Sequence, residues 1–143
     1  MTKILISFLV LVALLLPPVG AEGVPNLVGN WTGVGSAAIY EIRDILPGDP
    51  TNLTYVEESI SKFTMIITEQ MGRRFVGTKF PNVHPEESEA LLGVIGPDNE
   101  TLYMVDENGL LDGRLISTNE MEVVYRQVGP TGMIVAINKF TRV

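Results

Sequence analysis

The sequence predicts an all-β domain in the form of a closed antiparallel up-and-down barrel of about eight strands. Turn-forming residues recur roughly every eight to twelve positions after residue 21, the spacing of short strands joined by tight turns. The runs between them alternate apolar and polar residues, and none keeps a helical period over several turns. Sequential hairpins of this kind form a meander that can close. A sandwich or an open sheet of the same strands is the alternative.

Four strands are expected in the first part of the domain, at residues 27–40, 60–69, 73–80 and 89–95. The first strand carries Gly29 and Gly33, and glycines inside a strand often mark a bulge or a close approach of another segment. The irregular stretch 41–58 contains Pro47 and Pro50. We expect it to be a long loop or a lid over one end of the barrel.

Four more strands are expected at residues 101–105, 110–117, 121–128 and 133–141. Asn108-Gly109 is a strong hairpin signal between two of them, because both residues tolerate a positive φ angle. Leu111 and Leu115 are expected to face inward, and Asp112 outward. The other residues expected on the inner face are mostly large and apolar. They are Trp31, Phe63, Met65, Phe75, Leu92, Leu102, Met104, Met121, Val123, Tyr125, Val135 and Ile137.

The N-terminus has the pattern of a secretory signal peptide. Lys3 precedes an apolar run from Ile4 to Leu16, which two prolines and the small residues Val19-Gly20-Ala21 follow. The run is shorter than the roughly 20 residues of a membrane-spanning helix. We therefore expect residues 1–21 to be removed and residues 22–143 to form a single secreted or cell-surface domain. An uncleaved N-terminal membrane anchor is the alternative.

Charge and residue types exclude several classes of function. The chain has 10 Lys and Arg against 17 Asp and Glu, and its net charge of −7 becomes −8 when Lys3 is removed. Nucleic-acid binding is not expected, because it depends on basic residues that neutralise phosphates. The sequence contains no cysteine, which excludes disulfides, thiol catalysis and cysteine-bound metals. Stability must therefore come from the core and from closure of the barrel.

The polar residues form no catalytic or metal-binding pattern. A Ser–His–Asp triad or a zinc site would need His84, the one histidine, which lies in a polar loop. Asp98, Asp106 and Glu107 fall in expected turns, where solvated carboxylates are usual. We expect no catalytic residue, no metal site and no cofactor, and therefore no enzyme.

Two asparagines are candidate glycosylation sites in a secreted protein. Asn52 and Asn99 each begin an Asn-x-Ser/Thr sequence in an expected loop. Asn30 begins a third such sequence, but it lies inside an expected strand beside Trp31 and is discounted.

The segment Gly29-Asn30-Trp31 resembles the Gly-x-Trp of the first strand of the calycins, which include lipocalins, fatty-acid-binding proteins and avidins. Residues 65–78, with Phe75-Val76-Gly77-Thr78 after a glycine turn, resemble the second and third avidin strands. Residues 137–143 resemble the last strand. The resemblance implies a barrel that holds a small ligand. The chain is also similar to small secreted proteins of archaeal type, which implies no activity.

The calycin resemblance also implies how the barrel is closed. In that family a basic residue late in the last strand packs over the tryptophan, and Arg142 is the candidate here, with Lys139 second. A guanidinium stacks well on an indole face. Avidins, however, have a tyrosine where Lys79 stands and several pocket tryptophans, whereas this chain has only Trp31. Biotin is therefore not the expected ligand.

Two functions are compatible with this reading. The first is binding of a small apolar or amphipathic ligand inside the barrel, with Trp31, Phe63, Phe75, Met104 and Tyr125 facing it. Eight strands enclose room for packed side chains or for one small ligand. The second is a non-enzymatic structural or interaction protein of the cell envelope, with a filled barrel.

Some strands are apolar on both faces, as at Leu91-Leu92 and Ile134-Val135. A homo-oligomer, in which outer strand faces pair, is one explanation, and a loop, helix or lid that covers one side of the barrel is the alternative.

Overall fold

The structure is a computed structural model that describes residues 23–41 and 53–143, without the side chains of residues 57–61. The predicted signal peptide, residues 42–52 of the predicted loop, and Asn52 lie outside the described residues. Where the chain is described, no helix is long and apolar enough to cross a membrane.

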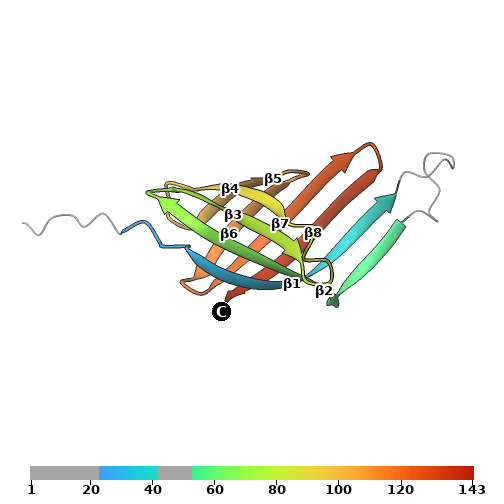
Figure 1. The fold of residues 1–143 in the computed structure, drawn as a ribbon, viewed down its shortest axis with the longest axis horizontal. Coiled ribbons are helices and arrows are strands. Elements are labelled where there is room, and N and C mark those ends of the chain that lie inside the picture. Colours follow the sequence, from blue (N-terminus) through green and yellow to red (C-terminus); the bar gives the residue numbers. More distant parts are fainter. Residues whose placement is uncertain (1–22, 42–52) are drawn as a thin grey trace, which may run out of the picture.

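Eight antiparallel strands follow one another around a closed barrel in the order of the chain (Figure 1). They are β1 (Gly29–Glu41), β2 (Leu53–Met71), β3 (Arg74–Pro81), β4 (Glu89–Ile95), β5 (Thr101–Asp106), β6 (Leu110–Ser117), β7 (Glu120–Gly129) and β8 (Gly132–Arg142). β1 pairs with β2 and also with β8, from Trp31 opposite Arg142 to Glu41 opposite Gly132. The β1–β8 ladder is the contact that an open sheet lacks, so the predicted closed barrel is confirmed.

The strand bounds agree with the sequence except at the start of β2. β4 and β6 have the predicted bounds, and most other ends differ by one or two residues. β2 begins at Leu53 instead of residue 60, so the end of the predicted loop 41–58 is strand. There Tyr55 lies opposite Ala38 in β1. The β-branched and aromatic residues at 54–56 favour a strand, and the prolines that indicated a loop lie before them.

The apolar core lies inside the barrel. Its buried members are Leu27, Trp31, Met65, Ile67, Phe75, Leu91, Ile95, Leu102, Met104, Leu111, Leu115, Met121, Val123 and Phe140. The inward positions predicted for β6 are confirmed, and Asp112 points outward to form an exposed ion pair with Arg126.

The predicted inner row is wrong on β4 and β8. Leu92, Val135 and Ile137 face outward and are 55%, 51% and 43% exposed, respectively. Leu91 takes the inward position on β4, and the buried residues of β8 are Asn138 and Phe140. Both strands are apolar on both faces, so alternation alone does not fix which face is inside. The pairing with the neighbouring strands determines which face lies inside the barrel.

The two ends of the barrel are built differently. Consecutive loops of a meander alternate between the ends. At one end lie the β2–β3, β4–β5 and β6–β7 turns together with residues 23–28 and the C-terminus, and we call this the closed end. The β3–β4, β5–β6 and β7–β8 connections lie at the opposite end, which we call the open end.

The closed end is sealed by residues that join the two termini of the barrel. The Arg142 guanidinium lies 4.4 Å from the centroid of the Trp31 ring, and Trp31 is fully buried. Arg142 donates hydrogen bonds to the carbonyls of Val28 (2.8 Å) and Asn26 (2.6 Å). The indole N–H of Trp31 donates to the carbonyl of Leu27 (2.9 Å). The structure thus brings together the two residues that the resemblance paired.

Gly29 and Gln70 complete this end. Gly29 has φ of +143°, and a Cβ there would lie 3.3 Å from Nη1 of Arg142, so the turn into β1 requires glycine. Gln70 accepts from the backbone N–H of Leu27 (2.8 Å) and donates to the carbonyl of Pro25 (2.9 Å). Residues 25–28 are therefore held across the barrel end by hydrogen bonds from three strands.

Candidate functional site

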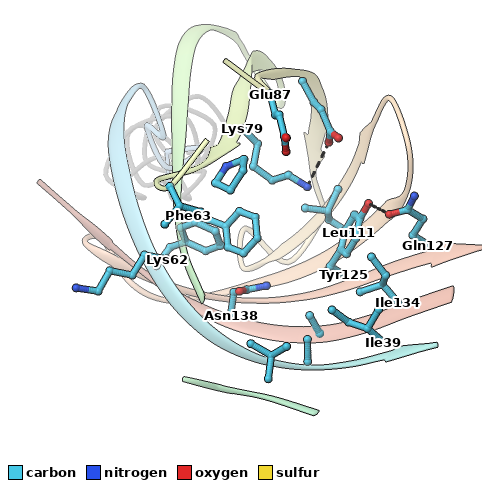
Figure 2. Close-up of a pocket in the computed structure, with 17 residues that line it drawn as sticks. Ile39, Lys62, Phe63, Lys79, Glu87, Leu111, Tyr125, Gln127, Ile134 and Asn138 are labelled. Atoms are coloured by element: carbon cyan, nitrogen blue, oxygen red, sulfur yellow. Dashed lines mark hydrogen bonds and ion pairs between the residues drawn. The ribbon is translucent and has the colours of Figure 1, made fainter. Parts of the chain in front are cut away.

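The open half of the barrel contains a cavity of about 410 Å³ (Figure 2). This volume lies in the range of small-molecule sites, roughly 300–1,000 Å³. Its apolar wall consists of Ala37, Ile39, Val56, Phe63, Pro81, Val83, Leu111, Ile134, Ala136 and Phe140. The polar lining consists of Lys62, Lys79, Glu87, Glu89, Tyr125, Gln127 and Asn138.

The cavity exists because small residues replace large ones on the inner face of β1 and β8. Ala37 and Ala136 are opposite each other in the β1–β8 ladder, and both line the cavity. Nearer the closed end, the rings of Phe140 and Phe63 fill the corresponding space inside the barrel. Phe140 is buried, and Phe63 packs against the core while also lining the cavity. These two rings separate the hollow half from the filled half.

A buried ion pair lies beside the cavity, where β3 and β5 end and β4 begins. Lys79 on β3 faces inward and is 8% exposed, and its Nζ forms an ion pair with Oδ2 of Asp106. The Asp106 side chain is fully buried at the end of β5. The Lys79 Nζ also lies 3.6 Å from Oε2 of Glu89 and 4.1 Å from the centroid of the Tyr125 ring.

The β5–β6 turn holds Asp106 in place. Its Oδ1 accepts hydrogen bonds from the backbone N–H groups of Asn108 (3.0 Å) and Gly109 (2.6 Å). Burial raises the pKa of Asp106, but the hydrogen bond and charge of Lys79, with these two N–H groups, outweigh it and leave the pKa below its ordinary value. Asp106 is therefore ionised at neutral pH and neutralises Lys79.

Glu89 and Tyr125 respond differently to the same surroundings. Burial raises the pKa of Glu89, although the Asn108 amide, 2.5 Å away, and the charge of Lys79 act against it. Burial also raises the pKa of Tyr125, and the charges of Asp106 and Glu89 raise it further. The Tyr125 hydroxyl donates to the side-chain oxygen of Gln127 at 2.8 Å.

Asn138 places a buried polar side chain beside the cavity. It is 7% exposed, lines the cavity from β8, and its side-chain oxygen accepts no hydrogen bond within the described residues. Leaving such a group without a partner costs about 1–3 kcal/mol. Figure 2 shows the amide on the side of the cavity away from Lys79. The oxygen is packed against Gly35, where a Cβ would lie 2.1 Å from it.

The structure divides the five residues that were expected to face a ligand. Phe63 and Tyr125 line the cavity. Trp31, Phe75 and Met104 lie in the packed core and do not line this cavity. The Phe75 ring, for example, lies over Gly93, its partner on the neighbouring strand β4, where a Cβ would lie 2.1 Å from its Cζ atom. Such close packing leaves no room for a ligand.

The sequence did not indicate the ion pair. Asp106 was expected to be a solvated turn residue, and it is instead fully buried. The available signal was Lys79, which alternates with Phe75 and Gly77 on the inward face of its strand. A lysine inside a barrel requires a carboxylate partner, and the strand ends nearby supply one.

The loop around His84 is solvated, as predicted. The side chains of His84, Glu86 and Glu87 are exposed, and their donor atoms lie within 4.8 Å of one another. Nδ1 of His84 is 3.1 Å from Oε1 of Glu86. Asn99, the glycosylation candidate that the structure describes, lies in the β4–β5 turn with φ of 62°.

Comparisons with known proteins identify no family for this chain. No protein-family model matches it, and no curated protein matches its sequence. A protein of unknown function from the DUF3598 family of Nostoc punctiforme PCC 73102 is 15% identical over 82% of this chain, with a TM-score of 0.43. This chain spans about half of that protein, 48% of its length.

A second solved structure also has a related shape. The S-type phycobiliprotein lyase from Guillardia theta is 8% identical, with a TM-score of 0.35, over 82% of this chain and 88% of its own length. At this level of similarity, neither structure indicates a ligand or an activity for this chain.

Proposed function

We propose that the protein is a secreted or cell-surface barrel that binds one small amphipathic molecule in the open-end cavity. The observation that carries the proposal is the cavity of about 410 Å³, whose mostly apolar wall also contains the buried amide side chain of Asn138. A barrel with only a structural role would gain stability by filling this space and by replacing Asn138 with an apolar residue.

The wall suits a molecule with an apolar body and a polar end. Ile39, Leu111 and Ile134 provide aliphatic contacts, and Phe63 provides an aromatic one. Burying an apolar body here gains about 25 cal/mol per Å² of apolar surface removed from water. The sealed closed end supports the strands on which these residues stand, which favours a preformed site.

Binding without chemistry is the simplest use of this cavity. The Lys79 ammonium is held by buried Asp106, and burial keeps Tyr125 protonated at neutral pH. Neither residue is thus available as a base or nucleophile, which supports a non-enzymatic role.

Native mass spectrometry of the protein purified from its own source tests the proposal. The expected result is an extra mass of a few hundred daltons that disappears on denaturation. The denatured mass should correspond to a chain that begins at residue 22, with or without a glycan. A chain that retains residues 1–21 would contradict secretion by cleavage. Ligand-free protein that also takes up no added apolar probe would contradict ligand binding.

The outer surface favours a second candidate, an interaction protein. Leu92 and Val105 are cross-strand neighbours on β4 and β5, and so are Val94 and Tyr103. These four side chains are 40–55% exposed and lie together on the outside of the barrel. If this face pairs two copies of the chain, sedimentation velocity should show a dimer that Leu92→Lys converts to a monomer. A wild-type monomer at every concentration would exclude this candidate.

A further inference from the structure

We infer that the cavity selects amphipathic molecules with a positively charged amine head, which pairs with Glu89. The inference rests on the proposed function and names the chemical class of its ligand.

The charges around the cavity are unbalanced. Lys62, Lys79, Glu87 and Glu89 line it, and Asp106 lies behind Lys79. Figure 2 shows the Lys62 side chain directed away from the cavity. One ammonium group and three carboxylates therefore remain near the space that a ligand head would occupy. This excess of negative charge favours a cation over an anion.

Lys79 is not free to bind an anionic head. Its ammonium is paired with the fully buried carboxylate of Asp106, lies over the Tyr125 ring, and is only 10% exposed at the side chain. Asp106 in turn is fixed by the N–H groups of the β5–β6 turn. A ligand carboxylate could reach Lys79 only by displacing Asp106, which would leave a buried negative charge without a partner.

Glu89, by contrast, has an oxygen that a ligand can use. Its Oε1 accepts from Nδ2 of Asn108 at 2.5 Å, and its Oε2 lies 3.6 Å from the Lys79 Nζ, beyond an ordinary hydrogen bond. The Glu89 side chain is 24% exposed and lines the cavity. A ligand ammonium at Oε2 would form a charge-assisted hydrogen bond in a partly desolvated place.

The other polar groups of the wall do not oppose this polarity. The Tyr125 hydroxyl already donates to Gln127. Asn138 carries no charge, and its oxygen is buried against Gly35, where a Cβ would lie 2.1 Å from it. The carboxylate of Glu89 is therefore the acceptor that determines the head group.

Displacement of the neutral fluorescent probe N-phenyl-1-naphthylamine tests this inference on the full chain. Decylamine, decanol and decanoate compete with the probe for the cavity at pH 7. These three molecules share one apolar chain and differ only in the head group. We expect decylamine to bind about tenfold more tightly than decanol, and decanoate to bind most weakly. Added sodium chloride should weaken the binding of decylamine and leave the binding of decanol unchanged. This test uses the wild-type protein alone.

Glu89→Gln keeps the shape of the side chain and removes its charge. It should bring the affinity for decylamine to that for decanol, while decanol binding stays the same. The matched control is Glu107→Gln, because Glu107 lies in the neighbouring turn, is exposed and does not line the cavity. It should retain the preference for decylamine.

The possible failures are distinguishable. Equal binding of the three competitors, or a preference for decylamine that survives in Glu89→Gln, would overturn the amine inference and leave the proposed function standing. If neither the probe nor any competitor binds to the folded wild-type chain, the proposed function itself fails.

Discussion

The two halves of the barrel are made from the same eight strands, yet their interiors differ. In the closed half, Trp31, Phe75 and Met121 fill the width of the barrel and are almost fully buried. In the open half, the facing positions on β1 and β8 are alanines, and charged and amide side chains line a cavity. The difference indicates that stability is concentrated at one end, which leaves the other end free to keep a cavity.

The largest expected effect is the loss of the residue that fills the closed end. Trp31→Ala should lower the free energy of unfolding by about 3–5 kcal/mol, because it opens a cavity in the packed half and removes the surface on which Arg142 stacks. Ile134→Ala, on the cavity wall, should cost about 1 kcal/mol, since the space beside it is already open. Urea unfolding measures both, and equal losses would contradict the division into two halves.

The ion pair should give the next largest effect. Lys79→Met leaves Asp106 buried without its partner and should destabilise the fold by about 3 kcal/mol. The double variant Lys79→Met with Asp106→Asn should recover part of this loss, because the amide oxygen can still accept from the β5–β6 turn. A single variant as stable as the wild type would show that the pair is solvated.

Adding volume to each half should give smaller effects, which again differ between the two halves. Gly93→Ala should destabilise by about 1–3 kcal/mol, because the new Cβ would lie 2.1 Å from the Phe75 ring. Ala136→Val extends into the cavity and should change stability by less than about 0.5 kcal/mol. Thermal unfolding of both variants checks the comparison. A destabilising Ala136→Val would mean that the open half is packed.

The smallest effect is in the pH dependence. The folded-state pKa of Asp106 is lowered, so its contribution to stability is present above the unfolded pKa of about 4 and is lost as pH falls through the folded value. The stability gap between wild type and Asp106→Asn should therefore be widest near neutral pH and close in acid. The pH dependence that Glu89 contributes has the opposite sign. Its pKa is raised in the folded state, so its contribution to stability is lost as pH rises through the folded value. Stability measured for Asp106→Asn and Glu89→Gln from pH 3 to pH 7 should show these opposite trends, and parallel curves would contradict them.

Most of the fold could be predicted from the sequence, but little of the site could. Turn residues such as Asn108-Gly109 fix where strands end, and strict alternation fixed the inner face of β6. Alternation failed at Leu91-Leu92 and Ile134-Val135, where both faces are apolar and only pairing with neighbouring strands decides.

The site depends on features that are not local in the chain. The Lys79–Asp106 pair joins residues on two strands that are not neighbours in the barrel order. Similarly, the cavity depends on Ala37 lying opposite Ala136, which is 99 residues away along the chain. Neither the ion pair nor the pairing of the two alanines can be predicted from the residue pattern of a single strand. They also could not distinguish Phe63, on the cavity wall, from Phe75, in the packed core.

The most direct test of the central claim, that the open half is a ligand cavity, fills it with a side chain. Ala136→Trp places an indole in the cavity, and Val135→Trp places the same group outside the barrel on the next residue. Titration of both folded variants with N-phenyl-1-naphthylamine provides the measurement, with circular dichroism as the check on folding. We predict that Val135→Trp binds the probe like the wild type and that Ala136→Trp binds it at least about tenfold more weakly. Equal binding by the two folded variants would contradict the cavity as the binding site.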